Sequence, residues 1–300
     1  MNNQNLITKP ATLILLEGWG LSPFWANNAI NYAEPANFNF YWQNYPHLTL
    51  KTLNRKHSTT GFCMLSLSSG CLYKPHSKYF KGEKVFFHSK PNLSKIISGN
   101  GLKQLKITEK IAVKNISEYF NGFKDSEYDG EKRVLIGNEN IDVGKKPEMN
   151  SNDFPEYLFK ELESENYDFI LIVFPNIDLL KNAKIELVSK AVKAIDDTLG
   201  KIVDIILDKN GQIFISSSCG GAEHIGRSEI MEKIDFYDYV PFIHIKNNNS
   251  KSTVVNFTRE VISQIIDPKA SIDSIAPTIL ESLSIGRNEQ MTGKSLLNQI

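Results

Sequence analysis

The segment Thr12-Leu13-Ile14-Leu15-Leu16-Glu17-Gly18-Trp19-Gly20 decides the fold. Its first five residues form an apolar run, which is typical of a strand buried on both faces. The glycines that follow predict a tight turn directly after the strand. Functional groups of parallel sheets gather just past the carboxyl ends of the strands, so Glu17 is a candidate functional residue.

Four further apolar runs predict strands of the same kind, at 133–136, 169–174, 212–216 and 240–245. Apolar residues recur at three- and four-residue steps from Ile185 to Ile206, which predicts an amphipathic helix that Asn210-Gly211 ends. Shorter helices are expected at about 152–163 and 275–283. Buried strands that alternate with amphipathic helices predict an α/β domain with a largely parallel sheet.

The composition excludes several classes of protein. Thirty-four Lys and Arg residues balance thirty-four Asp and Glu residues, so net charge predicts no specific nucleic-acid partner. Cys63, Cys71 and Cys219 form no C-x-x-C pair. The first ten residues lack the pattern of a signal peptide, and no apolar run approaches the roughly 20 residues of a transmembrane segment. We therefore expect a cytoplasmic protein.

The segment from Tyr73 to Lys95 is basic and aromatic, with Glu83 as its one acid. Such a segment suits an anionic surface or a groove on a protein partner, whereas many lysine-rich segments are simply solvated loops. The residues expected to contact a protein partner are Lys78, Phe80, Lys81, Lys84, Phe86 and Phe87.

Several segments, spread in order along most of the chain, match the segments of a single known family. They include Leu15–Gly20, Leu65–Gly70, Gly101–Ile107, Tyr119–Gly122, Phe174–Asp178 and Met291–Leu296. Together they resemble cofactor-independent phosphoglycerate mutase, a family within the alkaline phosphatase superfamily. The resemblance implies an alkaline-phosphatase-like domain whose central sheet is flanked by helices on both faces.

The resemblance also implies the loss of a domain. Members of that family have a phosphatase-like domain that holds two divalent metals, and a transferase domain inserted into it. Residues 1–87 resemble the first phosphatase segment, and residues 93–300 resemble the segment after the insertion. We therefore expect one phosphatase-like domain over residues 1–300, with residues 88–92 marking the deleted transferase domain.

The family's reaction passes through a serine phosphoenzyme, and Asp and His side chains hold the two metals. By resemblance, the nucleophile falls on Thr60. The carboxylates at metal-ligand positions are Glu17 in place of Asp, Asp178 unchanged, and Asp235 in place of His. Other ligands are replaced by neutral residues: Asn182 and Cys219 stand at His positions, Ser218 at an Asp position, and Ala112 at the position of an active-site lysine.

These replacements predict a pseudoenzyme: a catalytically degenerate homologue that acts as a structural or regulatory subunit of a protein assembly and needs no cofactor. The alternative is a residual phosphohydrolase with a single Mn or Mg ion and Thr60 as nucleophile. Each remaining residue also has an ordinary structural interpretation. Asp178 and Thr60 are residue types that cap helices, Glu17 is a strand-end carboxylate, and Cys219 is a small residue suited to burial.

Overall fold

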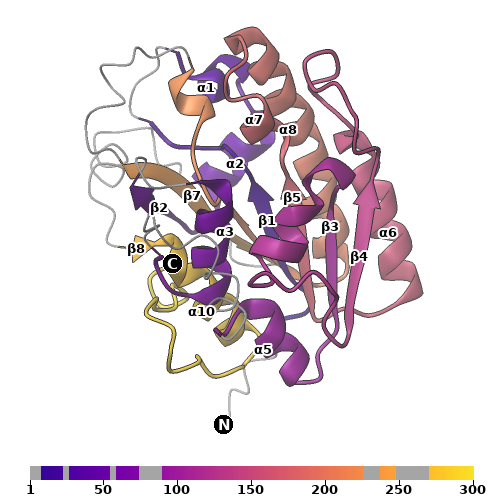
Figure 1. The fold of residues 1–300 in the computed structure, drawn as a ribbon, viewed down its shortest axis with the longest axis vertical. Helices are drawn as coiled ribbons and strands as arrows, with labels where there is room; N and C mark the ends of the chain where they lie inside the picture. Colours follow the sequence, from indigo (N-terminus) through magenta and orange to yellow (C-terminus); the bar gives the residue numbers. More distant parts are fainter. Residues whose placement is uncertain (1–7, 23–26, 55–58, 74–89, 226–236, 248–269) are drawn as a thin grey trace.

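A central sheet of eight strands organises the structure, a computed structural model that describes residues 8–22, 27–54, 59–73, 90–225, 237–247 and 270–300 (Figure 1). The strand order is β4-β3-β5-β1-β6-β7-β2-β8. The strands are β1 (Ala11–Leu16), β2 (His47–Asn54), β3 (Gln104–Glu109), β4 (Glu131–Ile136), β5 (Phe169–Phe174), β6 (Gln212–Ser216), β7 (Tyr237–Lys246) and β8 (Ala270–Ser271).

Most neighbouring strands run parallel, as the sequence predicts. Parallel pairs join β4, β3, β5, β1 and β6, and a further parallel pair joins β2 and β8. Strand β7 is antiparallel to both β6 and β2. Strand β1 lies between β5 and β6, where Leu16 pairs with Phe174 and Leu15 with Ser216. The carboxyl ends of these three strands therefore meet at one edge of the sheet.

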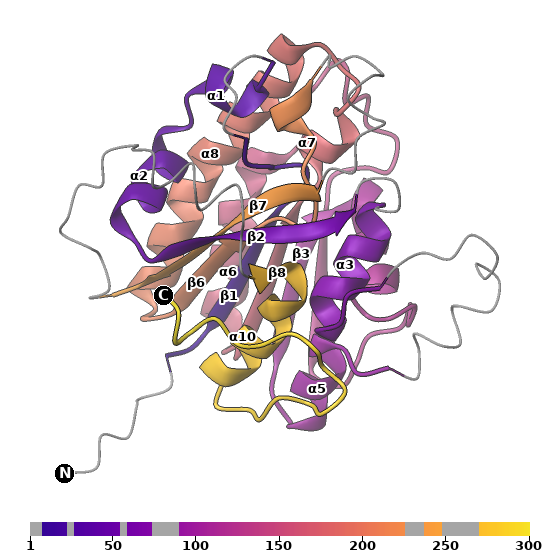
Figure 2. The ribbon, with the colours of Figure 1, turned by 90° about the vertical axis from the view of Figure 1, so that its left-hand side faces the viewer.

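Helices cover both faces of the sheet, which confirms the expected architecture (Figure 2). One layer contains α1 (Ala29–Ala33), α2 (Ala36–Asn44), α6 (Phe154–Ser164) and α8 (Ile185–Asp208), and the other contains α3 (Thr60–Ser69), α5 (Leu93–Gly99) and α10 (Ile275–Ser282). The side chains of β1 alternate between the two cores: Ile14 and Leu16 face the first layer, and Leu13 and Leu15 face the second.

Short helical segments complete the framework around the sheet. The α-helix α7 (Asn176–Leu179) follows β5, and the 3-10 segments are η1 (Lys110–Ala112), η3 (Ser151–Asp153), η4 (Ala222–His224) and η6 (Ile272–Ser274). Segment η2 (Asn115–Tyr119) is a π-helix. No helix within the described ranges combines the length and the apolar character needed to cross a bilayer.

A contact between helices fixes the start of α2. Residue Pro35 at its N-terminus provides no side-chain cap. Instead, Asp196 of α8 accepts hydrogen bonds from the backbone N–H groups of Asn37 at 2.9 Å and Phe38 at 2.7 Å. Asp196 is buried, so its carboxylate acts as a cap supplied from another helix.

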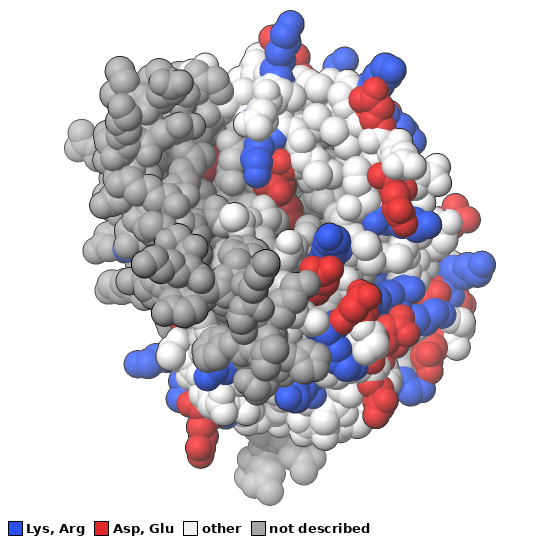
Figure 3. Space-filling view, viewed as in Figure 1, with Lys and Arg blue, Asp and Glu red and all other residues white. Residues whose placement is uncertain are grey.

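The visible charged surface carries both signs. Over the region formed by β4 and α6, basic and acidic side chains are interspersed (Figure 3). Ion pairs there include Lys132 with Glu161 at 2.7 Å and Lys209 with Glu163 at 2.6 Å. This mixture matches the balanced composition of the chain.

Candidate functional site

The candidate site lies where β1, β5 and β6 end. Glu17 follows β1, Asp178 lies in α7 directly after β5, and Ser218 and Cys219 follow β6. Backbone hydrogen bonds join these loops: Asp178 N–H donates to the Glu17 carbonyl at 3.1 Å, and Gly18 N–H donates to the Cys219 carbonyl at 3.2 Å. The parallel topology therefore brings residues distant in sequence to one place.

Gly18 makes this approach possible. Its φ is +87°, in the region that favours glycine. A Cβ atom there would lie 2.8 Å from the backbone nitrogen of Asp178. The turn predicted after Glu17 is therefore present, and it sets how closely the Glu17 and Asp178 loops pack.

Helix α3 adds Thr60 to the site. Thr59 is the N-cap residue, since its side chain accepts a hydrogen bond from Phe62 N–H at 3.4 Å. Thr60 is therefore the first helical residue rather than the cap. Its Oγ1 donates a hydrogen bond to Asp178 Oδ2 at 2.8 Å and lies 3.7 Å from Cys219 Sγ.

Glu17 is fully buried at the base of the site. The Ser218 hydroxyl donates to Glu17 Oε2, Ser218 N–H donates to Oε1 at 3.4 Å, and Cys219 Sγ lies 3.8 Å from Oε2. Burial raises the pKa of Glu17 to about 8, and the charge of Asp178 adds to this effect while hydrogen bonds from Ser218 oppose it. The Glu17 carboxyl is therefore mainly protonated at pH 7.

The Cys219 thiol is also neutral. Burial raises its pKa well above the usual range, and the carboxylates of Glu17 and Asp178 raise it further. Reactive and metal-binding cysteines act as thiolates, so Cys219 lacks the charge state of a nucleophile at neutral pH.

Lys181 is a site residue that the sequence analysis missed. Its Nζ lies 3.3 Å from Asp178 Oδ1, and its side chain is about half exposed. The spacing of three residues from Asp178 was the available signal, since residues three apart in a helical turn are neighbours. Lys181 gives the exposed side of Asp178 a positive partner.

Several expected residues do not join this group. Asn182 is exposed on the turn after α7, and the described contacts include no hydrogen bond from it to Glu17, Thr60 or Cys219. Ala112 is buried at the end of η1. The remaining expected residues lie outside the described ranges: Asp235, Lys78, Phe80, Lys81, Lys84, Phe86 and Phe87.

The fold and the cluster of side chains at the strand ends can be compared with those of known protein families. Residues 9–286 match the family model described as the Metalloenzyme superfamily, and the chain belongs to that family. Its sequence is 30% identical over 227 residues to the 2,3-bisphosphoglycerate-independent phosphoglycerate mutase of Clostridium acetobutylicum. The matched region covers 72% of this chain and 41% of that protein. The Methanosarcina barkeri phosphoglycerate mutase 2 is 32% identical over 207 residues, covering 68% and 37%.

Solved structures show the same fold at low sequence identity. The Leishmania mexicana phosphoglycerate mutase at low cobalt concentration has a TM-score of 0.56 and 17% identity, covering 67% of this chain and 38% of that one. The Listeria monocytogenes lipoteichoic acid synthase LtaP has a TM-score of 0.60 and 14% identity, covering 97% and 76%. An alkaline phosphatase superfamily protein from Vibrio parahaemolyticus has a TM-score of 0.59 and 13% identity, covering 96% and 69%. The alkaline-phosphatase-like fold class predicted above is confirmed.

The expectation that no cofactor is needed is wrong. The match to the Metalloenzyme superfamily and the mutase relatives point to a metal ion, Mn or Mg, as the family's cofactor. Glu17, Asp178 and Thr60 supply oxygen donors of the type that such hard ions prefer. Among the described residues, however, no group of three or more His, Cys, Asp or Glu side chains is arranged to hold a metal ion. The described donors therefore do not fit a pair of ions.

Proposed function

We propose that this chain is a catalytically degenerate relative of the phosphoglycerate mutases that acts as a structural or regulatory subunit of a cytoplasmic protein assembly. The observation that carries the proposal is the hydrogen-bonded pair of Glu17 and Ser218. A carboxyl group must lose its proton to serve as a strong metal ligand. Glu17 is fully buried and its carboxyl accepts a hydrogen bond from the neutral Ser218, whereas the mutase pattern has an aspartate at both positions.

The remaining charge at the described site is small. Asp178 is opposed by Lys181, and the neighbouring Ser218 and Cys219 are neutral. Two-metal phosphoryl transfer needs several anionic ligands to offset the charge of two divalent ions. The described side chains therefore carry too little negative charge for two divalent ions, and they bond to one another instead.

The size of the chain is consistent with the loss of the transferase domain. The chain spans about two fifths of the length of the mutases it matches. We propose that residues 88–92 mark the place of that domain, between the phosphatase-like segments 1–87 and 93–300. A chain without the substrate-binding domain would lack the arginines that hold phosphoglycerate in the mutase family.

The packing of the C-terminal segment supports a retained structural role. Met291 and Leu296 are buried, and the backbone N–H groups of Thr292 and Gly293 donate to the Gly70 carbonyl at 2.9 and 3.0 Å. These contacts lie in segments that also resemble the mutases, whereas the ligand positions differ. A fold preserved around an altered site favours a role that depends on shape.

The subunit role predicts a stable partner. Affinity purification at native expression, followed by mass spectrometry, should recover a second protein at a constant ratio to this chain. Substituting the predicted contact residues Lys81 and Phe86 with Ala should reduce that ratio. Recovery of the chain only as a free monomer would contradict the subunit role.

The state of Glu17 predicts the pH dependence of stability. The folded pKa of about 8 lies above the unfolded value of 4.5. The folded state therefore binds the extra proton, and this contribution to stability is present below pH 4.5 and lost as pH rises through 8. The Glu17→Gln variant keeps the shape without the titration, so its stability relative to the parent should increase from pH 5 to pH 8.5. Urea denaturation at each pH measures this difference, and a difference that does not change with pH would contradict a protonated Glu17.

One observation favours a second candidate function, a phosphohydrolase with a single metal ion and Thr60 as nucleophile. The Thr60 hydroxyl donates to Asp178 at 2.8 Å, which is the geometry of a nucleophile beside a base. A metal ion seated there would offset charge on a phosphate ester. The pairing of Asp178 with Lys181 weighs against this role, because it places a positive charge beside the same carboxylate.

A further inference from the structure

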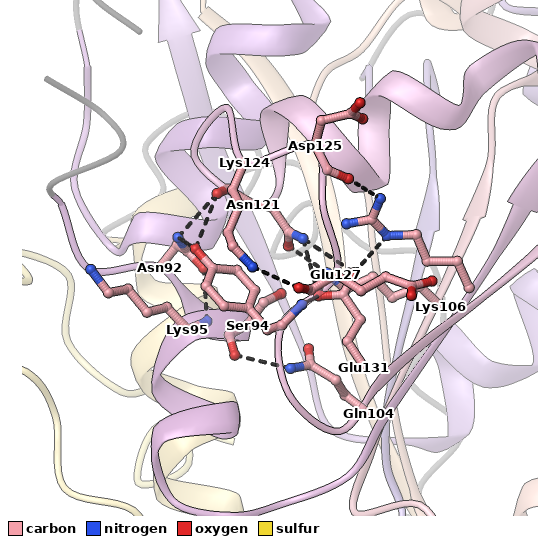
Figure 4. Close-up of polar contacts among 12 residues, drawn as sticks. Asn92, Ser94, Lys95, Gln104, Lys106, Asn121, Lys124, Asp125, Glu127 and Glu131 are labelled. Carbon is pink, nitrogen blue, oxygen red and sulfur yellow. Dashed lines mark hydrogen bonds and ion pairs between the residues drawn. The ribbon is translucent and has the colours of Figure 1, made fainter. Parts of the chain in front are cut away.

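A second polar cluster lies in the interior, between β3, β4 and the segment after η2 (Figure 4). The Lys106 side chain is fully buried, and its Nζ lies 3.1 Å from Glu131 Oε2 and donates to Asn121 Oδ1. Glu131 also accepts hydrogen bonds from Arg133 Nε at 2.6 Å and from Asn121 Nδ2 at 3.0 and 3.1 Å. We call Lys106, Glu131 and Asn121 the buried cluster.

In the buried cluster one carboxylate, Glu131, pairs with Lys106 and also with the neighbouring Arg133. Burial would raise the pKa of Glu131, but the charges of Lys106 and Arg133, with hydrogen bonds from Arg133 and Asn121, lower it overall. Burial lowers the pKa of Lys106 to about 7, and the charge of Glu131 opposes that change. A buried ion pair adds little net stability over apolar side chains of similar size, because desolvation offsets the attraction. The cluster does, however, specify one geometry, since each polar group has a defined partner.

The buried cluster fixes the end of the π-helix η2. Asn121 follows Tyr119, the last residue of η2, after one intervening residue, Phe120. Phe120 is fully buried, and Lys106 Nζ lies 5.3 Å from the centroid of its ring. π-helical turns are rare and occur frequently at functional sites. The cluster therefore holds both residues that follow Tyr119.

The ring of Tyr119 contacts the start of α3. A Cβ atom at Gly61 would lie 2.7 Å from Tyr119 Cε1 and 2.8 Å from Cζ, so the ring packs directly on the glycine backbone. Gly61 is the residue after Thr60, in the first turn of α3. The position of the Tyr119 ring therefore limits where the backbone that carries Thr60 can lie.

We propose that the buried cluster is a positioning device for the candidate site: by fixing Phe120 and Asn121 it holds the ring of Tyr119 against Gly61 and so sets the place of Thr60 beside Asp178. The members of the cluster act through Tyr119: Lys106 and Glu131 pair with each other, with Asn121 and with Arg133, whereas Thr60 bonds to Asp178. This role concerns the geometry of Thr60 alone. It holds for a catalytic and for a non-catalytic site.

Two readouts at the site test the proposal without an activity assay. The first is amide hydrogen exchange in residues 60–66, and the second is the reaction rate of the Cys219 thiol in a Cys63→Ala, Cys71→Ser background. Lys106→Met and Tyr119→Ala are each expected to raise the exchange rate and the thiol reaction rate by about tenfold, since the first turn of α3 would open more often. Tyr119→Phe keeps the ring and is expected to leave both unchanged.

Tyr119→Ala keeps the test decisive if Lys106→Met fails to fold, because Tyr119 is only partly buried and carries no buried charge. Asp196→Ala is the matched control, since it removes the cap of α2 in the opposite helix layer. It is expected to lower stability and leave both readouts unchanged. The proposal is overturned if Tyr119→Ala keeps both readouts within about twofold of the parent, or if Asp196→Ala raises them equally.

Discussion

The Glu131→Gln variant is expected to lose about 3–5 kcal/mol of unfolding free energy, the typical cost of breaking a buried ion pair. Glutamine has the same size as glutamate, so the substitution removes the charge and little of the packing. It leaves the fully buried Lys106 and the nearly buried Arg133 without their anion. Urea denaturation at pH 7, analysed at a constant m-value, measures the loss.

Two comparisons make this prediction specific. Glu165→Gln removes an exposed ion pair with Lys103 and should cost much less, because water screens that pair. Lys106→Met should cost less than Glu131→Gln, because Arg133 still balances the carboxylate. If Glu131→Gln cost no more than Glu165→Gln, the buried cluster would not be an ionised pair.

Restoring the mutase ligands at four of the replaced positions is expected to restore metal binding. A variant that combines Glu17→Asp, Asn182→His, Ser218→Asp and Cys219→His should be less stable than the parent without metal, because two acids then share a buried site. Added Mn²⁺ should reverse the loss. An ion at about 100 times its Kd stabilises a folded protein by about 2.7 kcal/mol, so thermal unfolding with and without Mn²⁺ measures the effect.

The unchanged ligand provides the control for this variant. Adding Asp178→Asn to the combination should abolish most of the stabilisation by Mn²⁺, since Asp178 is the one mutase ligand that the chain keeps unchanged and it contacts Thr60. The parent chain should gain less from Mn²⁺ than the combined variant. Equal gains for the parent and the combined variant would mean that the replaced residues do not limit metal binding.

The apolar strands and long helices could be predicted from the sequence, but strand β3 could not. The run Gln104–Glu109 alternates polar and apolar residues, which is typical of a strand with one face in water, yet all six residues are buried. Gln104, Lys106 and Thr108 each find a hydrogen-bond partner inside the protein. The partners of Lys106 come from a later strand and from the two residues that follow a π-helix, so they leave no local signal, and the buried cluster was missed.

The convergence of the candidate site follows from the order of the strands, whereas its charge does not. Glu17, Asp178 and Cys219 each follow a predicted parallel strand, so their proximity could be expected. The protonation of Glu17 depends on complete burial, which only the structure shows. Asn182 lies beyond the end of α7, which ends after a single turn, and its side chain is exposed.

Hydrolysis of p-nitrophenyl phosphate by the purified chain, at varied Mn²⁺, Mg²⁺ and Zn²⁺, tests the proposed loss of catalysis most directly. The matched variant is Thr60→Ala, which removes the one hydroxyl placed beside Asp178 by α3. The proposed loss of catalysis predicts that the parent and Thr60→Ala show the same background rate at every metal concentration. A metal-dependent rate in the parent that disappears in Thr60→Ala would contradict it.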